Sequence, residues 1–214
     1  MQTYSVNNKE RVKVIVLLVI LSYFIAILIN KVLERIMNII CNIEWIDSFI
    51  SQIEFTGMDI KQITLLAIFW VLYEWFDKDL WKMKIFQKTC VNIPNLNGQW
   101  KGTYYSDYNG KKEGLANLEI KQTWTKISII SHHLESDSFS RVANILLDTN
   151  KGTNIVFQYE NITNEKSSDT MHDHKGYSDL IYTMNQDKEI LKGEYTGDQI
   201  NRKAAGYVTY EKIK

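Results

Sequence analysis

The chain has 214 residues, with 25 basic and 25 acidic side chains, so its formal net charge is zero. This length allows one domain with an appendage, or two small domains. The balanced charge argues against non-specific nucleic-acid binding through a global positive field, and we expect no direct DNA or RNA partner. Cys41 and Cys90 lie in no CxxC or Cys/His ligand spacing and are interpreted as reduced thiols.

The first predicted element is a transmembrane helix over about residues 12–30. Val14 to Ile29 carries no charge, and with Val12 it spans roughly 24 to 27 Å as a helix, close to the hydrocarbon thickness of a bilayer. A secretory signal peptide shares the basic start, but the small-residue cleavage site is missing.

An isoleucine seam follows the first span. Its members recur at alternating spacings of three and four, and the same register runs back through Val32, Ile29 and Ile25. They are Ile36, Ile39, Ile43, Ile46, Ile50 and Ile53. This heptad pattern predicts that the helix extends to about residue 55 and that the seam mediates self-association into oligomers. The alternative is that the seam packs within one chain against residues 60–76.

A second span is predicted over about residues 60–76. Lys61 and Glu74 lie near its ends, where they can snorkel, and Trp70, Tyr73 and Trp75 supply aromatic residues for an interface. A helix lying on the membrane surface is the alternative. Basic residues precede the first span and follow the second, so we expect a multi-pass protein of the bacterial inner membrane with both termini in the cytoplasm.

Pro94, the only proline, marks the boundary between a membrane region (1–92) and a strand-rich domain (93–214). We expect an all-β domain in which eight strands form an antiparallel up-and-down, lipocalin-like barrel. The predicted strands are 98–106, 115–124, 125–131, 138–147, 154–161, 176–184, 189–196 and 204–212.

Alternation within these strands predicts which residues face inward. Ala116, Leu118, Ile120 and Gln122 share one face of the second strand. In a meander, alternate connections gather at one end of a barrel, and the end opposite Trp100 collects the long polar ones. We therefore place a ligand mouth at that end.

With these residues in view, the C-terminal half resembles the cyclic-dinucleotide receptor domain of the CD-NTase-associated protein 15 family. Members of that family are CBASS anti-phage effectors with two transmembrane helices and a β-barrel. The resemblance covers nearly everything after Ile93. The matching pieces are Pro94 to Gly102, Ile120-Lys121-Gln122 with Trp124, Ser136-x-Ser138-x-Ser140, Tyr159-x-Asn161, His174-Lys175-Gly176, and Leu191-x-Gly193-x-Tyr195 followed by Arg202 and Gly206.

The resemblance implies that one chain both binds a signalling nucleotide and kills the cell. A partner CD-NTase makes a cyclic dinucleotide, which binds the barrel. The effector then oligomerises and disrupts the lipid bilayer of the inner membrane, which leads to cell death. It implies no cofactor beyond this ligand.

Candidate ligand contacts come from the geometry of the predicted mouth, not from the family. Arg202 is the candidate for a phosphate, because a guanidinium pairs with phosphate bidentately. Tyr104, Tyr159 and Tyr195 are candidates for stacking on bases, with core packing as the alternative for each. Candidates for reading base edges or sugar are Ser138, Ser140, Asn161, His174 and Asn201.

No catalytic pattern emerges from the sequence. It contains no nucleophile elbow, Walker loop or paired-carboxylate motif, and we expect no catalytic residues and no enzymatic activity. His132-His133 and His172-x-His174 find no third ligand at a recognisable spacing, so we expect no metal site. Two other functions stay open: a membrane-tethered, lipocalin-like barrel for a small apolar ligand, and a structural membrane protein.

Overall fold

The computed structural model describes residues 1–5, 8–40, 60–89, 91–107, 112–134, 136–149, 152–164, 173–199 and 202–213. The chain divides into two compact units. One comprises Met1–Asn7 together with Asn92–Lys214, and the other comprises Asn8–Val91. The later boundary agrees with the one expected at Pro94. The first seven residues, however, belong with the strands and not with the membrane region as expected.

The helical unit contains α1 (Asn8–Ile40), α3 (Ile60–Lys78), the 3-10 turn η1 (Leu80–Lys82) and α4 (Lys84–Thr89). Within it, Arg11–Val32 is long and apolar enough to cross a membrane, and no other helix of the described residues meets that criterion. The segment predicted as a second span is helical as α3, but its spanning role is not established by length and composition. The predicted helical extension is observed to Ile40, and the rest of it lies outside the described residues.

One stripe of α1 is buried, and it is not the isoleucine seam. Val14, Leu18, Ser22 and Ala26 recur every four residues and are at most 4% exposed. Since α3 is the helix that contacts α1, this stripe is the side of α1 used within the unit. The seam residues Ile29, Val32 and Ile36 are 37%, 56% and 42% exposed. The alternative in which residues Ile36 to Ile53 pack on residues 60–76 stays a prediction, because most of that seam lies outside the described residues.

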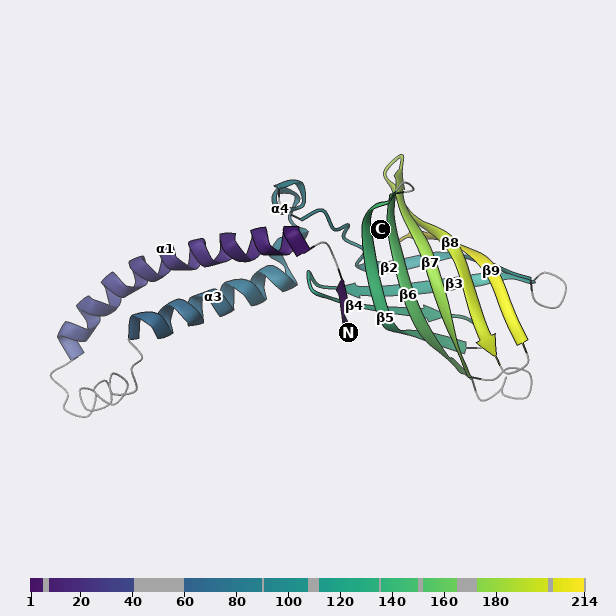
Figure 1. The fold of residues 1–214 in the computed structure, drawn as a ribbon, viewed down its shortest axis with the longest axis horizontal. Helices are drawn as coiled ribbons and strands as arrows, with labels where there is room; N and C mark the ends of the chain where they lie inside the picture. The colour runs from purple at the N-terminus through teal and green to yellow at the C-terminus, as the bar shows by residue number, and fades with distance from the viewer. Residues whose placement is uncertain are drawn as a thin grey trace. The chain divides into compact units, whose positions relative to one another are not determined.

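The other unit is a closed antiparallel barrel (Figure 1). Eight strands follow one another in the chain, each antiparallel to the next, and β2 closes the ring by pairing with β9. They are β2 (Gly98–Ser106), β3 (Lys112–Gln122), β4 (Lys126–His132), β5 (Ser136–Thr149), β6 (Gly152–Thr163), β7 (His174–Asn185), β8 (Lys188–Gln199) and β9 (Arg202–Lys212). All eight segments predicted as strands are strands, and most are longer than expected.

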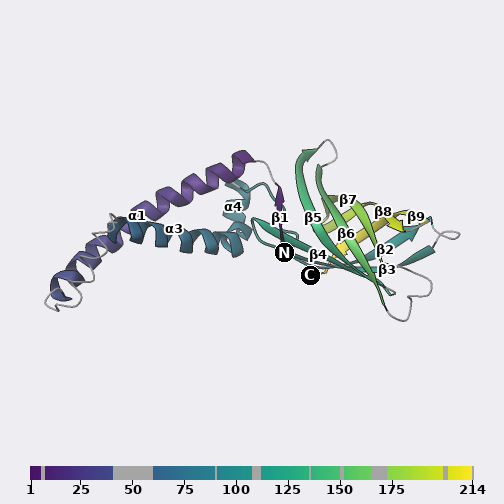
Figure 2. The same cartoon turned by 60° about the horizontal axis from the view of Figure 1, so that its bottom comes forward.

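A ninth strand makes the predicted strand count wrong. β1 (Gln2–Ser5) lies between β4 and β5, which separate toward one end of the barrel. Gln2 and Thr3 pair antiparallel with β4, while Tyr4 and Ser5 pair parallel with β5. Figure 2 shows β1 in purple beside β5. The start of the chain therefore fills the gap that β4 and β5 leave.

The predicted inward faces are confirmed. Ala116, Leu118, Ile120 and Gln122 are at most 3% exposed. Trp100 is fully buried, and its indole N–H donates to the carbonyl of Leu96 at 3.0 Å. Leu96 in turn donates its N–H to the Gln122 side chain at 2.8 Å. The stretch after Pro94 thus closes one end of the barrel.

Candidate functional site

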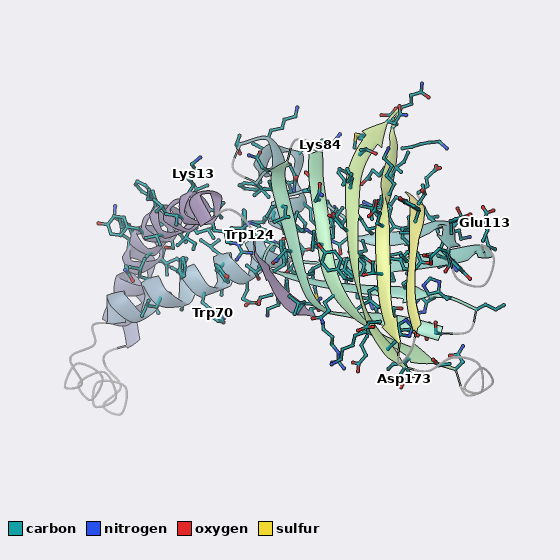
Figure 3. All side chains as sticks on the ribbon, turned by 45° about the vertical axis from the view of Figure 1, so that its right-hand side comes forward. Lys13, Trp70, Lys84, Glu113, Trp124 and Asp173 are labelled. Atoms are coloured by element: carbon teal, nitrogen blue, oxygen red, sulfur yellow. The ribbon has the colours of Figure 1, made fainter. Side chains whose placement is uncertain are left out.

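The barrel interior has two chemically different ends. At the Trp100 end, aliphatic side chains with at most 1% exposure fill the space: Leu118, Ile127, Ile129, Ile155, Leu180 and Leu191. Toward the other end, the buried side chains are polar: Ser106, Ser131, Ser136, Ser138, Tyr159, Asn161 and Ser178. In Figure 3, Trp124 marks the first end, and Glu113 and Asp173 mark the second. Buried polar groups need partners, so the polar end is the candidate site.

Three tyrosines of the polar end lie against glycines on the neighbouring strand. Each tyrosine is the direct cross-strand partner of its glycine: Tyr104 with Gly114, Tyr159 with Gly176, and Tyr195 with Gly206. A Cβ at Gly114 would come within 2.6 Å of the Tyr104 ring, and one at Gly206 within 2.7 Å of the Tyr195 ring. The glycines therefore let these rings lie against the barrel wall.

Asn161 carries an unsatisfied buried atom. Its amide nitrogen donates to the hydroxyls of Ser136 and Ser138 at 2.9 and 2.8 Å, and Asn161 is 3% exposed. Within the described part of the chain, its Oδ1 atom has no hydrogen-bond partner. An unmade hydrogen bond on a buried polar atom costs about 1–3 kcal/mol. The two serines hold the amide so that one acceptor remains available for a donor from outside the protein.

A second group of polar side chains continues across the interior. The Ser131 hydroxyl lies 2.9 Å from His133 Nε2 and 3.4 Å from the Tyr210 hydroxyl. The His133 ring meets the Tyr104 ring edge to face, with centroids 5.3 Å apart. From the sequence, His133 was considered only as a metal ligand, and Ser131 and Tyr210 were not singled out. Alternation along β4 and β9 was the signal that could have placed them inside.

Burial shifts the pKa values of three side chains of this end, Tyr159, Tyr210 and His133, in the direction that favours the neutral form. Burial raises the pKa of Tyr159, with Tyr195 and Tyr210 adding smaller effects, and burial raises the pKa of Tyr210 to about 12. Burial likewise lowers the pKa of His133, although Asp137 opposes the shift. These side chains therefore present hydrogen-bond donors and acceptors without placing a negative charge in the interior.

Several predicted site residues come together. Ser138 is the cross-strand partner of Asn161, and Asn161 is the partner of His174. The His174 and Tyr159 rings lie 6.5 Å apart. The Tyr159 hydroxyl donates to the carbonyl of Thr196 at 3.1 Å. Tyr195 hydrogen bonds with Ser106. The structure thus gathers Ser138, Tyr159, Asn161 and His174 into one cluster.

Ser140 has a different role from the one expected. Its hydroxyl accepts the amide N–H of Ile129 on β4 at 2.9 Å and the side-chain N–H of Gln2 on β1 at 2.6 Å. It therefore joins three strands at the place where β4 and β5 separate. Its part in ligand contact stays a prediction.

Two further candidates are located only in part. Arg202 begins β9, where its backbone pairs with Gln199, but its side chain is not among those described. Asn201 lies outside the described residues. Among the described residues, no group of three or more His, Cys, Asp and Glu side chains is placed to hold a metal ion.

Comparison with known proteins identifies the domain that carries this cluster. Residues 91–212 match the family model described as Cap15, cyclic dinucleotide receptor domain. The chain belongs to the Cap15 family. It is also similar to a CD-NTase-associated protein 15 of Yersinia aleksiciae, with 26% identity over 172 residues, which is 80% of each chain. The family match spans β2 to β9 and the whole polar cluster, and it leaves out β1.

Proposed function

We propose that this chain is a membrane-anchored cyclic-dinucleotide receptor that acts as a CBASS effector, and that the polar end of the barrel interior is its binding site. The observation that carries the proposal is the free acceptor of Asn161, buried within the domain that matches the Cap15 receptor model. The family's description and the name of the Yersinia relative support a ligand made by a CD-NTase.

The chemistry of the cluster suits such a ligand. A cyclic dinucleotide presents two phosphate monoanions and two bases with N–H groups at their edges. Asn161 would accept from a base N–H, while Tyr104, Tyr159 and Tyr195 would offer ring faces for stacking. Arg202 stays our candidate for a phosphate, since the buried polar side chains described at this end are serines and Asn161, which carry no charge. Nothing in this chemistry requires turnover, so we infer a receptor that is not an enzyme.

Calorimetry with the detergent-solubilised full chain and a panel of cyclic di- and trinucleotides tests the proposal. We expect binding of one such compound and an affinity loss of about tenfold for Asn161→Ala, the effect of one lost hydrogen bond. Asn154→Ala is the matched control, because Asn154 lies on the same strand and bonds Asp179 instead. No binding by folded wild-type protein to any compound would refute the proposal.

A polar ligand fits this interior better than the apolar ligand considered as an alternative. The apolar part of the interior is already filled by side chains with almost no exposure, among them Ile127, Ile155 and Leu191. Close-packed aliphatic groups leave no room for an apolar guest. The rest of the interior is polar, which argues against a small apolar ligand.

The membrane arrangement that we propose is a hairpin of α1 and α3, with both termini in the cytoplasm. β1 and β2–β9 form one barrel, so they must lie on the same side of the membrane. A chain that leaves that side through α1 has to return before Gly98, and α3 is the apolar helix available for the return. This supports a second crossing in spite of the short apolar run of α3.

Oligomerisation through the isoleucine seam, followed by disruption of the bilayer, completes the proposal. The seam residues Ile29, Val32 and Ile36 are exposed while a separate stripe of α1 is buried. The seam is therefore free for another copy. Ile36→Asp should abolish ligand-dependent crosslinking in membranes and cell killing, while leaving nucleotide affinity unchanged. Normal crosslinking and killing at wild-type abundance would exclude the seam as the assembly surface.

A further inference from the structure

The place where β1 inserts is the least regular seam of the barrel. β4 and β5 pair directly through only three residue pairs, from Ile130 with Phe139 to His132 with Asp137. Beyond Ser140 they separate, and the register of β5 with β6 shifts between Ser140 and Val142. Such irregularities are common next to functional sites. We call the gap between the separated parts of β4 and β5 the fork.

β1 is held in the fork by few contacts. It forms four residue pairs, two with each neighbour, whereas β2 and β3 form nine. Its main anchor is Tyr4, which is 2% exposed and donates its hydroxyl proton toward the carbonyl of Trp124 at 2.8 Å. The second anchor is the bond from Gln2 to Ser140 at 2.6 Å. A short strand with one large buried side chain can leave without unfolding the other eight.

β5 connects the fork to the polar cluster. Ser136 and Ser138 hold Asn161, and Ser140, two residues further along the same face, holds Gln2. A ligand that bonds Asn161 also acts on β5 next to the fork. Only two residues separate β1 from α1, which contains the segment long and apolar enough to cross a membrane. Release of β1 would therefore free the start of α1 from the barrel.

We propose that β1 is a latch: while it occupies the fork it restrains α1, and ligand binding at the polar end releases it, which lets α1 associate with other copies. The ligand's part in this mechanism rests on the proposed function. The docking of β1 as a restraint on α1 does not. Ligand binding and restraint can thus be tested apart.

A reversible crosslink tests the restraint in the full chain. Thr3 and Lys126 are direct partners across β1 and β4, and both are exposed. Thr3→Cys with Lys126→Cys, in a chain whose Cys41 and Cys90 are replaced by serine, would lock β1 in place when oxidised. The matched control is Lys101→Cys with Asn117→Cys, an exposed partner pair on β2 and β3 away from the fork.

The measurements are nucleotide affinity and dye release from liposomes that contain the purified protein. We expect the oxidised fork pair to bind nucleotide within threefold of wild type, to release no dye, and to regain release after reduction. The control pair should release dye in both states. Nucleotide-dependent release by the oxidised fork pair, equal to that of the control, would overturn the latch.

The opposite variant opens the latch. Tyr4→Ala removes the main anchor and should cause dye release without nucleotide, while Tyr4→Phe, which keeps the ring, should stay dependent on nucleotide. Failure of the proposed function looks different: wild type would bind no nucleotide, yet Tyr4→Ala would still release dye unprompted. A Tyr4→Ala protein that melts as wild type does and still requires nucleotide would refute the restraint.

Discussion

The two ends of the barrel interior are built on the same strands with the same alternation, yet the side chains that fill them are chemically different. At the Trp100 end, large aliphatic side chains meet one another and exclude water. At the Asn161 end, serines, glycines and tyrosines replace them, and the Asn161 Oδ1 acceptor has no partner among the described residues. With the proposed binding site, stability and ligand recognition are separated along the length of each strand. A variant at one end should change stability, and a variant at the other should change affinity.

The largest expected effect is a loss of stability from a variant at the apolar end. Trp100→Ala should lower the free energy of unfolding by about 3–5 kcal/mol, because it removes a fully buried indole and leaves a cavity. It also removes the cation–π contact with the Lys212 ammonium, which lies 5.4 Å from the ring centroid. Urea unfolding followed by near-ultraviolet circular dichroism measures this loss.

Tyr104→Ala is the counterpart of this variant at the polar end. It should destabilise the barrel less than Trp100→Ala and weaken nucleotide binding more. Equal loss of affinity in the two variants, measured while both remain folded, would show that the ends are not separate.

A smaller effect tests the wall of the polar end. Gly114→Ala should cost about 1–3 kcal/mol, because the three atoms nearest to the added Cβ all belong to the Tyr104 side chain, which it overpacks. In the double variant Gly114→Ala with Tyr104→Ala the clash disappears. A double-mutant cycle measured by urea unfolding should therefore give a coupling energy above about 0.5 kcal/mol. Additive effects would mean that the ring moves aside at no cost.

The smallest effect concerns alkaline pH. Burial holds the pKa of Tyr159 above its unfolded value. The stability that depends on the neutral phenol is complete below about pH 10 and falls as the unfolded chain ionises above it. Between pH 10 and 11 this one tyrosine should account for about 1 kcal/mol. Tyr159→Phe should flatten the pH dependence of unfolding by that amount, and an unchanged slope would contradict the buried environment.

Alternation in the sequence was enough to predict the eight later strands, the inward face of β3 and the end that carries the polar residues. These features depend on which residues lie two apart in one strand, and that spacing can be read directly from the sequence. Asn161 and Ser138 were singled out in this way, and the register brings them together. In the Asn161 side chain the amide nitrogen is bonded and the oxygen has no partner among the described residues. This difference depends on Ser136 and could not be inferred from the sequence.

β1 escaped prediction because its partners are far away in the chain. Gln2–Ser5 is only four residues long and precedes a basic segment typical of a membrane flank. Its strand conformation depends on β4 and β5, and the misjudged role of Ser140 has the same origin, since Gln2 takes that hydroxyl. A local pattern carries no information about a pairing 138 residues apart.

The position of β1 also sets the order in which the protein is made. β1 is synthesised first, but its partners on β4 and β5 lie more than 100 residues later, as the 120-residue separation of Tyr4 and Trp124 shows. At ribosomal speeds of about 5–20 residues per second, β1 waits for roughly 6 to 24 s. In that time α1 and α3 have left the ribosome. In the proposed hairpin, a start carried to the wrong face of the bilayer could never fill the fork, so completion of the barrel would itself be a check on the proposed insertion.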